Sequence, residues 1–141
     1  MCAVLLGCGG HPRDASPPPP AAGKRQAATL LTVQRNGGKT ATLDLLTVRR
    51  DGSAELDKRY GGAGRRRDTF RITKARMAQI RRGLRALPRR SSSDASARKG
   101  SVTFLLRFGG RDHVAQLGAL SALERPLIRA LDGVIAGKGR E

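Results

Sequence analysis

Apolar residues between positions 28 and 137 recur with two different periods, and each change of period marks a new element. Alternation at every second position predicts strands, whereas recurrence at every third and fourth position predicts amphipathic helices. The alternating segments are short and rich in Leu, Val and Thr, as strands are. The predicted strands are 28–35, 40–50, 54–59, 69–72, 101–108 and 111–117.

Glycine-containing turns separate most of these segments. Asn36-Gly37-Gly38, Asp51-Gly52 and Gly109-Gly110 are typical hairpin turns, because Gly, Asn and Asp tolerate a positive φ. Residues 61–64 are expected to form a flexible loop, and residues 89–100 a polar one. Strands joined by tight turns pair antiparallel, so the pattern favours an antiparallel sheet.

Two stripes of apolar residues at helical spacing predict the helices. The first has Thr73 as its N-cap and ends before Pro88. The second opens on Ser121 and Glu124, a capping box, and ends at Gly137 and Gly139; Pro126 near the end of the first turn also allows a start at Leu123 or later. The predicted stripes are Met77, Ile80, Leu84 and Leu87 in the first helix, and Leu123, Leu127, Leu131 and Val134 in the second.

These elements predict one small α+β domain over residues 28–137, followed by a tail at 138–141. One-sided helices and half-apolar strands satisfy each other when they form two layers. We therefore expect an antiparallel sheet of five to six strands with two helices packed on one face. One Tyr, three Phe and no Trp imply an aliphatic core.

The segment Leu5-Leu6-Gly7-Cys8 resembles a bacterial lipobox, in which a lipidated cysteine becomes the mature N-terminus. That resemblance makes residues 1–7 a truncated signal peptide remnant and Cys8 the lipid-attachment residue. Residues 8–27 are a Pro- and Gly-rich tether with too few large apolar residues to fold. The implied location is the outside of the cell membrane, as in small exported lipoproteins of actinobacterial type. The alternative is a cytoplasmic chain in which these four residues occur by coincidence, since no basic residue precedes the short apolar stretch.

The chain carries 28 basic and 11 acidic residues, a formal net charge of +17. A surface that binds anionic headgroups, cell-wall polymer or nucleic acid is one interpretation. The other interpretation is a solvated surface whose excess of arginine reflects GC-rich codon usage. Nucleic acid is the weaker partner, because single-strand binders interleave basic residues with stacking aromatics. The anion-binding candidates are Arg65, Arg66, Arg67, Arg81, Arg82, Arg89 and Arg90.

Catalytic and metal-binding patterns are missing from the sequence. No Gly-x-Ser-x-Gly motif occurs, and His113, the only histidine of the predicted domain, is expected to be solvated in an edge strand. Asp51, Glu55 and Asp57 are interpreted as surface charge partners. A metal site needs about four ligands, which Cys2, Cys8 and His11 do not supply. We expect that the protein is not an enzyme and that it uses no cofactor, metal or small-molecule substrate.

The stretch from Leu31 to Ala136 resembles a group of small exported bacterial domains that includes the protealysin inhibitor emfourin. The resemblance rests on the Asp51-Gly52 turn, the segment from Phe70 to Leu87, the hairpin of residues 104–114, and the helix opening at 123–127. It implies a non-enzymatic binding domain whose partner is an extracellular protein such as a metalloprotease. It assigns no inhibitory residue, because the basic run at 65–67 and the serine-rich loop depart from the pattern.

Overall fold

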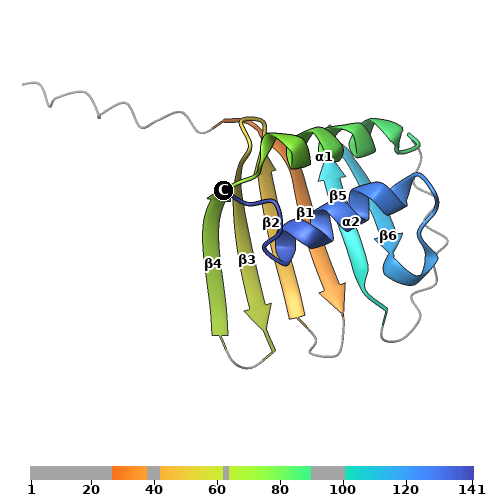
Figure 1. Cartoon of the computed structure of the whole chain (residues 1–141). Coiled ribbons are helices and arrows are strands. Elements are labelled where there is room, and N and C mark those ends of the chain that lie inside the picture. The colour runs from red at the N-terminus through yellow and green to blue at the C-terminus, as the bar shows by residue number, and fades with distance from the viewer. Residues whose placement is uncertain (1–26, 38–41, 62–63, 90–100) are drawn as a thin grey trace, which may run out of the picture.

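The computed structural model describes residues 27–37, 42–61, 64–89 and 101–141. Six antiparallel strands form one sheet, and two helices cover one of its faces, which confirms the predicted α+β fold (Figure 1). The elements follow the chain as β1 Thr29–Gly37, β2 Thr42–Arg49, β3 Ser53–Tyr60, β4 Gly64–Arg71, α1 Lys74–Ala86, β5 Thr103–Phe108, β6 Arg111–Gln116, the short 3-10 helix η1 Leu117–Ala119 and α2 Glu124–Ile135.

The strand order is β4-β3-β2-β1-β5-β6, so β1 lies inside the sheet between β2 and β5. The first four strands form a meander, each paired with the next. The chain then leaves the β4 edge, passes through α1 and enters the other half of the sheet at β5. Gly109 and Gly110 both have positive φ, as the predicted hairpin turn between β5 and β6 requires.

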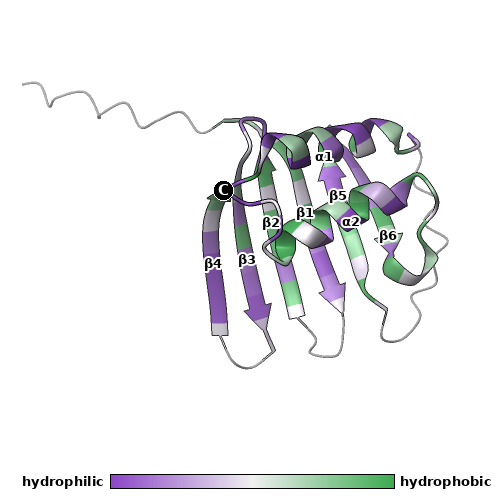
Figure 2. Ribbon diagram, in the orientation of Figure 1, coloured by the Kyte–Doolittle hydropathy of each residue, from purple (hydrophilic) through white to green (hydrophobic). Residues whose placement is uncertain are grey.

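The core lies between the sheet and the two helices. Green apolar positions alternate with purple polar ones along the inner strands, and the helices show mixed colouring (Figure 2). This alternation places every second strand residue under the helices. Each fully buried Leu, Ile, Val or Phe contributes roughly 1.5–3 kcal/mol of transfer free energy. The fully buried residues of this core include Leu31, Val33, Leu46, Leu56, Ile80, Phe104, Leu106, Leu127 and Leu131.

Helix α1 forms as predicted. The hydroxyl of Thr73 accepts a hydrogen bond from the backbone N–H of Arg76 at 3.3 Å, which caps the first turn. All four residues of its predicted apolar stripe are buried. The helix ends at Ala86, just before Leu87 and Pro88.

Helix α2 starts within the region that Pro126 allowed, but the first residue of its predicted stripe is not buried. The capping box is present: the N–H of Ser121 donates to Glu124 at 2.8 Å, and the N–H of Glu124 donates to the Ser121 hydroxyl at 3.3 Å. The regular helix, however, begins at Glu124. Leu123 therefore lies ahead of the helical stripe and is 54% exposed, so its assignment to the core was wrong. Leu127, Leu131 and Val134 are buried as expected.

Strand β4 is longer than the predicted strand at 69–72. It begins at Gly64, within the expected loop, and pairs with β3 from Tyr60↔Gly64 to Ser53↔Arg71. The sequence pattern missed this segment because it is almost entirely polar. Its strand conformation is supported by acidic side chains of the neighbouring strand, since opposite charges across an antiparallel pair are favourable.

Residues 138–141, expected to be a tail, are bonded to the domain. Glu141 donates its N–H to the carbonyl of Arg71 at 2.7 Å, and Arg140 forms a β-bridge with Ile72. The Arg140 guanidinium lies 4.0 Å from the ring centre of Phe70, and it also donates to the last carbonyls of α2. These contacts fasten the end of α2 to the β4 edge.

The two helices pack at Gly83 of α1 with no room for a side chain. A Cβ built at this position would lie 2.7 Å from Cβ of Leu127 and 3.1 Å from its Cδ1. Gly133 of α2 faces Arg76 near the other end of α1. The two pairs run in opposite directions along the chain, so α1 and α2 pack antiparallel, in contact where glycine removes a side chain.

Replacing Gly83 with Val should lower the free energy of unfolding by about 1–3 kcal/mol, because the added methyl groups overlap Leu127 in a packed contact. Chemical denaturation monitored by circular dichroism measures this change. The control is Gly118→Val, since nothing lies within 4 Å of a Cβ at Gly118. Equal stability of the two variants would contradict the proposed close approach.

Candidate anion-binding site

The arginine run at 65–67 lies on strand β4, where acidic neighbours meet each residue. Arg65 forms a two-pronged pair with Asp57, with contacts of 2.6 to 3.0 Å. Arg67 lies 2.6 Å from Glu55, and Arg66 lies 3.1 Å from Asp68. Much of the positive charge of this run is therefore already balanced within the protein.

Asp57 is more enclosed than expected. The sequence suggested a surface charge partner, and the partner is present, but the Asp57 side chain is only 5% exposed. Hydrogen bonds from Arg65 hold the pKa of Asp57 below its ordinary value. The same interaction raises the pKa of the Arg65 guanidinium. This pair fastens the β4 edge to β3, which gives the run a structural role.

Helix α1 presents the opposite situation. It carries Lys74, Arg76, Arg81, Arg82 and Arg85 and contains no acidic residue. Lys74 and Arg76 lie in the first turn, where the positive end of the helix dipole disfavours cations. This arrangement does not stabilise the helix. Because α1 carries no acidic residue to balance its cations, unbalanced positive charge concentrates around it.

Two neighbouring cavities lie along the side of α1 that faces away from α2. Arg50 and Arg81 line both of them. One has a volume of about 280 Å³ beside the β2–β3 turn, and the other has about 570 Å³ beside the β5–β6 turn. We call the two together the basic groove. Two carboxylates, Asp51 and Glu141, also line it. Its cations are Arg50, Arg71, Lys74, Arg81, Arg85 and Arg111.

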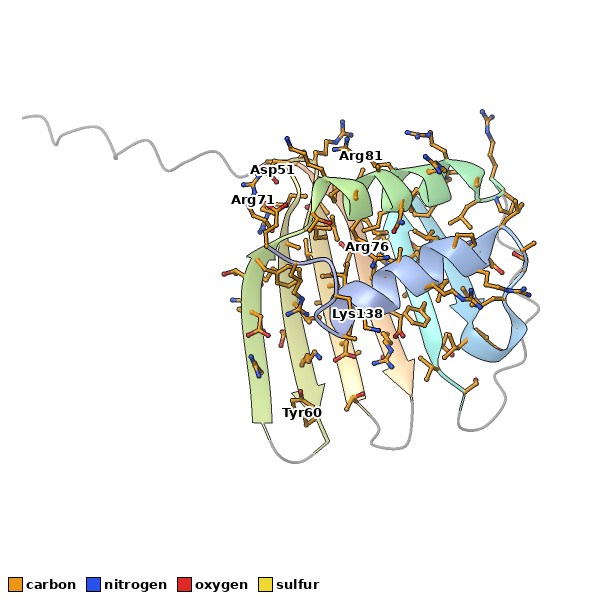
Figure 3. All side chains as sticks on the ribbon, viewed as in Figure 1. Asp51, Tyr60, Arg71, Arg76, Arg81 and Lys138 are labelled. Carbon is orange, nitrogen blue, oxygen red and sulfur yellow. The ribbon has the colours of Figure 1, made fainter. Side chains whose placement is uncertain are left out.

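Hydrogen bonds to backbone carbonyls position two of these cations. Arg81 donates to the carbonyl of Arg50 at 2.7 Å, and Arg71 donates to the carbonyl of Asp51 at 2.9 Å. Arg71, Arg81 and Asp51 gather at the end of the sheet where α1 begins (Figure 3). Across the described ranges, none of the six cations forms an ion pair with a carboxylate.

Asp51 offsets only part of the positive charge of the basic groove, because its one negative charge, acting on Arg71, and that of Glu141 face six cations. The same oxygen, Oδ1, accepts hydrogen bonds from the hydroxyl of Ser53 at 2.7 Å and from the N–H of Ser53 at 2.9 Å. These bonds, led by the hydroxyl, hold the pKa of Asp51 below its ordinary value. The carboxylate closes the β2–β3 turn, and the groove keeps an excess of positive charge.

The structure does not bring the seven predicted anion-binding arginines together. Residues 65–67 lie on the β4 edge, Arg81 lies in the basic groove, and Arg82 lies on the side of α1 that faces α2. Arg89 is exposed beyond the end of α1, and Arg90 lies outside the described residues. Cys8, Cys2, His11, the predicted signal and nearly all of the tether also lie outside them.

Sequence reasoning missed most of the basic groove. Arg50, Arg71, Lys74, Arg85 and Arg111 come from four separate segments and form no run. The absence of acidic residues along the first helix was the one available signal. Only the fold brings the β2–β3 turn, the β5–β6 turn and α1 into one place.

His113 is buried, contrary to the prediction of a solvated histidine. β6 is an edge strand, but the first turn of α2 covers it, and the His113 side chain is only 4% exposed. Its Nε2 lies 2.7 Å from Oε1 of Glu124. Burial would raise the pKa of Glu124, but hydrogen bonds from Ser121 and His113 outweigh burial and lower it. The pair joins β6 to α2.

Within the described residues, no three His, Cys, Asp or Glu side chains gather where they would hold a metal ion. In the same part of the chain, no helix has the length and apolar character needed to cross a bilayer. Guanidinium and ammonium groups, which bind anions through charge-assisted hydrogen bonds, line the basic groove.

Comparison with known proteins found no match to this chain among protein-family models, curated proteins or solved structures.

Replacing Glu124 with Gln should lower the free energy of unfolding at pH 7 by about 1–3 kcal/mol, because the hydrogen bonds to a charged group are weakened. The pKa of Glu124 is lowered in the folded state, so this contribution is present above the unfolded pKa. It is lost as the pH falls through the folded pKa. Thermal melts of both proteins between pH 7 and pH 3 measure the difference.

The control is Asp112→Asn, which removes an exposed pair with Arg107 and should change stability by less than about 1 kcal/mol. A Glu124→Gln effect that stays constant down to pH 3 would contradict this role of the carboxylate.

Proposed function

We propose that this protein is a non-enzymatic binding domain that holds anionic, phosphate-bearing polymers or headgroups in its basic groove. The proposal rests on one observation: six cations line two adjoining cavities and none is paired with a carboxylate of the described chain. Fixed guanidinium groups bind phosphate oxygens through charge-assisted hydrogen bonds. A cationic first turn in α1 would be stabilised by a bound anion.

The arginines of β4 and those of α1 differ in whether carboxylates accompany them. If the basic charge only followed codon usage, acidic residues would be expected to balance both regions equally. Instead, carboxylates accompany Arg65, Arg66 and Arg67, while Arg81 and Arg85 have none. This difference favours a functional origin for the charge around α1.

The proposed setting is the outer face of a cell membrane, with Cys8 lipidated and residues 8–27 as a tether. The Leu5-Leu6-Gly7-Cys8 segment and the proline run at 17–20 support this setting. A proline-rich segment extends about 3.1 Å per residue, which would hold the domain away from the bilayer while keeping anionic surfaces within reach. A cytoplasmic chain that binds nucleic acid is the alternative.

Inhibition of a metalloprotease, as in the emfourin group, is a second candidate. It is favoured by the element order: the hairpin at Asp51-Gly52, β4 leading into the Thr73-capped α1, the glycine hairpin and then α2. A protein partner would bring acidic side chains to the basic groove together with apolar contacts. Its binding would resist salt, whereas binding to a simple polyanion weakens steeply as salt rises.

The double variant Arg81→Glu/Arg85→Glu should weaken binding to phosphatidylglycerol vesicles at least tenfold at about 0.1 M salt, because each cation near an anionic surface contributes about 1 kcal/mol. Vesicle co-sedimentation over a salt series measures this affinity. The control Lys58→Glu/Lys138→Glu makes the same charge change outside the basic groove.

Equal loss in both double variants would show that only the net charge matters, which contradicts the groove. Salt-insensitive capture of a protease would favour the inhibitor candidate. Tighter binding to single-stranded RNA than to vesicles would favour the cytoplasmic alternative.

Expression of the gene together with the in-frame DNA upstream of Met1, in a bacterium fed an alkyne fatty acid, should label the protein at Cys8 and place it in the membrane fraction. Cys8→Ser should abolish both the label and the membrane association, whereas Cys2→Ser should preserve the label. In-gel fluorescence of fractionated cells measures the label. An unlabelled wild-type protein in the soluble fraction would overturn the membrane setting and leave the basic groove to be tested alone.

A further inference from the structure

A second hollow lies between the two helices, on the side of α1 away from the basic groove. Its volume is about 480 Å³, within the range of roughly 300–1,000 Å³ typical of ligand pockets. Gly83 and Ala130 lie at the floor of the hollow, where the two helices pack against each other. We call it the helix groove. Its lining is Arg76, Gln79, Arg82, Gly83, Ala86, Ala122, Leu123, Pro126, Arg129 and Ala130.

The helix groove has two chemically different ends. Because α1 and α2 run antiparallel, with Gly83 at Leu127 and Arg76 at Gly133, residues late in α1 lie opposite residues early in α2. Ala86, Leu123 and Pro126 therefore belong to one end, which is apolar apart from Arg82 beside Gly83. The other end lies toward Arg76, and Arg129 of α2 belongs to that half.

The cationic half is not neutralised from within. No carboxylate lines the helix groove, and among the described residues neither Arg82 nor Arg129 pairs with one. Arg76 donates to Gln79 at 2.9 Å, which positions its guanidinium without removing its charge. The carboxylates of α2 are engaged elsewhere: Asp132 lies 3.3 Å from Arg35, and Glu124 bonds to His113.

The apolar half shows the complementary feature. Leu123 is one of three large apolar residues that the described chain leaves exposed, and it opens into the helix groove. Pro126 and Ala86 continue the same apolar wall. A ligand suited to both halves is an amphiphile: an anionic head for the arginines and an aliphatic chain for the apolar wall.

We propose that the helix groove binds a single-chain aliphatic carboxylate of fatty-acid type. The carboxylate lies toward Arg76 and Arg129, and the chain passes Arg82 and lies along Ala86, Leu123 and Pro126. Guanidinium groups match carboxylates in charge and in hydrogen-bond geometry. This site shares no lining residue with the basic groove, so the proposal is independent of the proposed function.

The length of the groove indicates the length of the chain. From Arg76 to Ala86, ten residues of helix rise about 15 Å. Carbon–carbon bonds of about 1.5 Å, in a zigzag, advance about 1.25 Å each, so about twelve carbons span this distance. Decanoate is a soluble probe of suitable size.

The test is isothermal titration calorimetry of the full chain with decanoate. Decanoate should bind at least tenfold more tightly than butyrate, because six more methylene groups reach the apolar half. It should also bind at least tenfold more tightly than decyltrimethylammonium, which carries the opposite charge. Equal affinity for decanoate and butyrate, equal affinity for the two decyl amphiphiles, or no heat of binding would each overturn the proposal.

Two variants locate the site. Arg129→Glu should weaken decanoate binding at least tenfold, whereas Arg125→Glu, the same change one turn earlier on α2 and outside the lining, should leave it within twofold. Ala86→Phe fills the apolar half from an exposed position, so it should block binding without unfolding the domain. Unchanged affinity in Arg129→Glu and in Ala86→Phe, with native circular dichroism, would overturn the proposal.

Two further experiments test whether this site is distinct from the basic groove and whether the bound acyl chain comes from a free acid or from a membrane lipid. Arg81→Glu/Arg85→Glu should leave decanoate binding unchanged, and an equal loss there would overturn a distinct site. If Ala86→Phe weakens only decanoate binding, the ligand is a free acid. If it also weakens binding to phosphatidylglycerol vesicles, the groove takes acyl chains from a membrane as well.

Discussion

The contact between Gly83 of α1 and Leu127 of α2 is the constraint on which the positions of both grooves depend. The sheet has one apolar face, and two helices must cover it without separating. The absence of a side chain at Gly83 lets Leu127 approach closely, so both helices lie on the same core. This packing fixes which side of α1 turns toward α2 and which side turns toward the strand turns.

One helix thus serves three surfaces. Its apolar stripe is buried on the sheet, one flank with Arg81 and Arg85 lines the basic groove, and the other flank with Arg82 and Ala86 lines the helix groove. The three directions follow from a period of 3.6 residues. Substitutions one residue apart, such as Arg81 and Arg82, therefore affect different sites.

The two basic regions differ in whether acidic side chains accompany their arginines. On the sheet, Asp57, Glu55 and Asp68 each meet an arginine of β4, which stabilises a polar edge strand and discourages pairing with other chains. Around α1, Arg81 donates to the backbone carbonyl of Arg50 and Arg76 donates to the side-chain amide of Gln79. Net charge alone does not distinguish these situations, because it counts residues without their neighbours.

The sequence by itself determined the fold class, the α1 boundaries, the capping box of α2 and the buried stripes apart from Leu123, because these depend on local periodicity and on caps read within a few residues. It did not determine β4, which is polar and depends on partners in β3. It misplaced His113, because the cover over an edge strand comes from a helix eleven residues later. Both grooves were decided only by the tertiary structure, since their walls combine segments that are far apart in the chain.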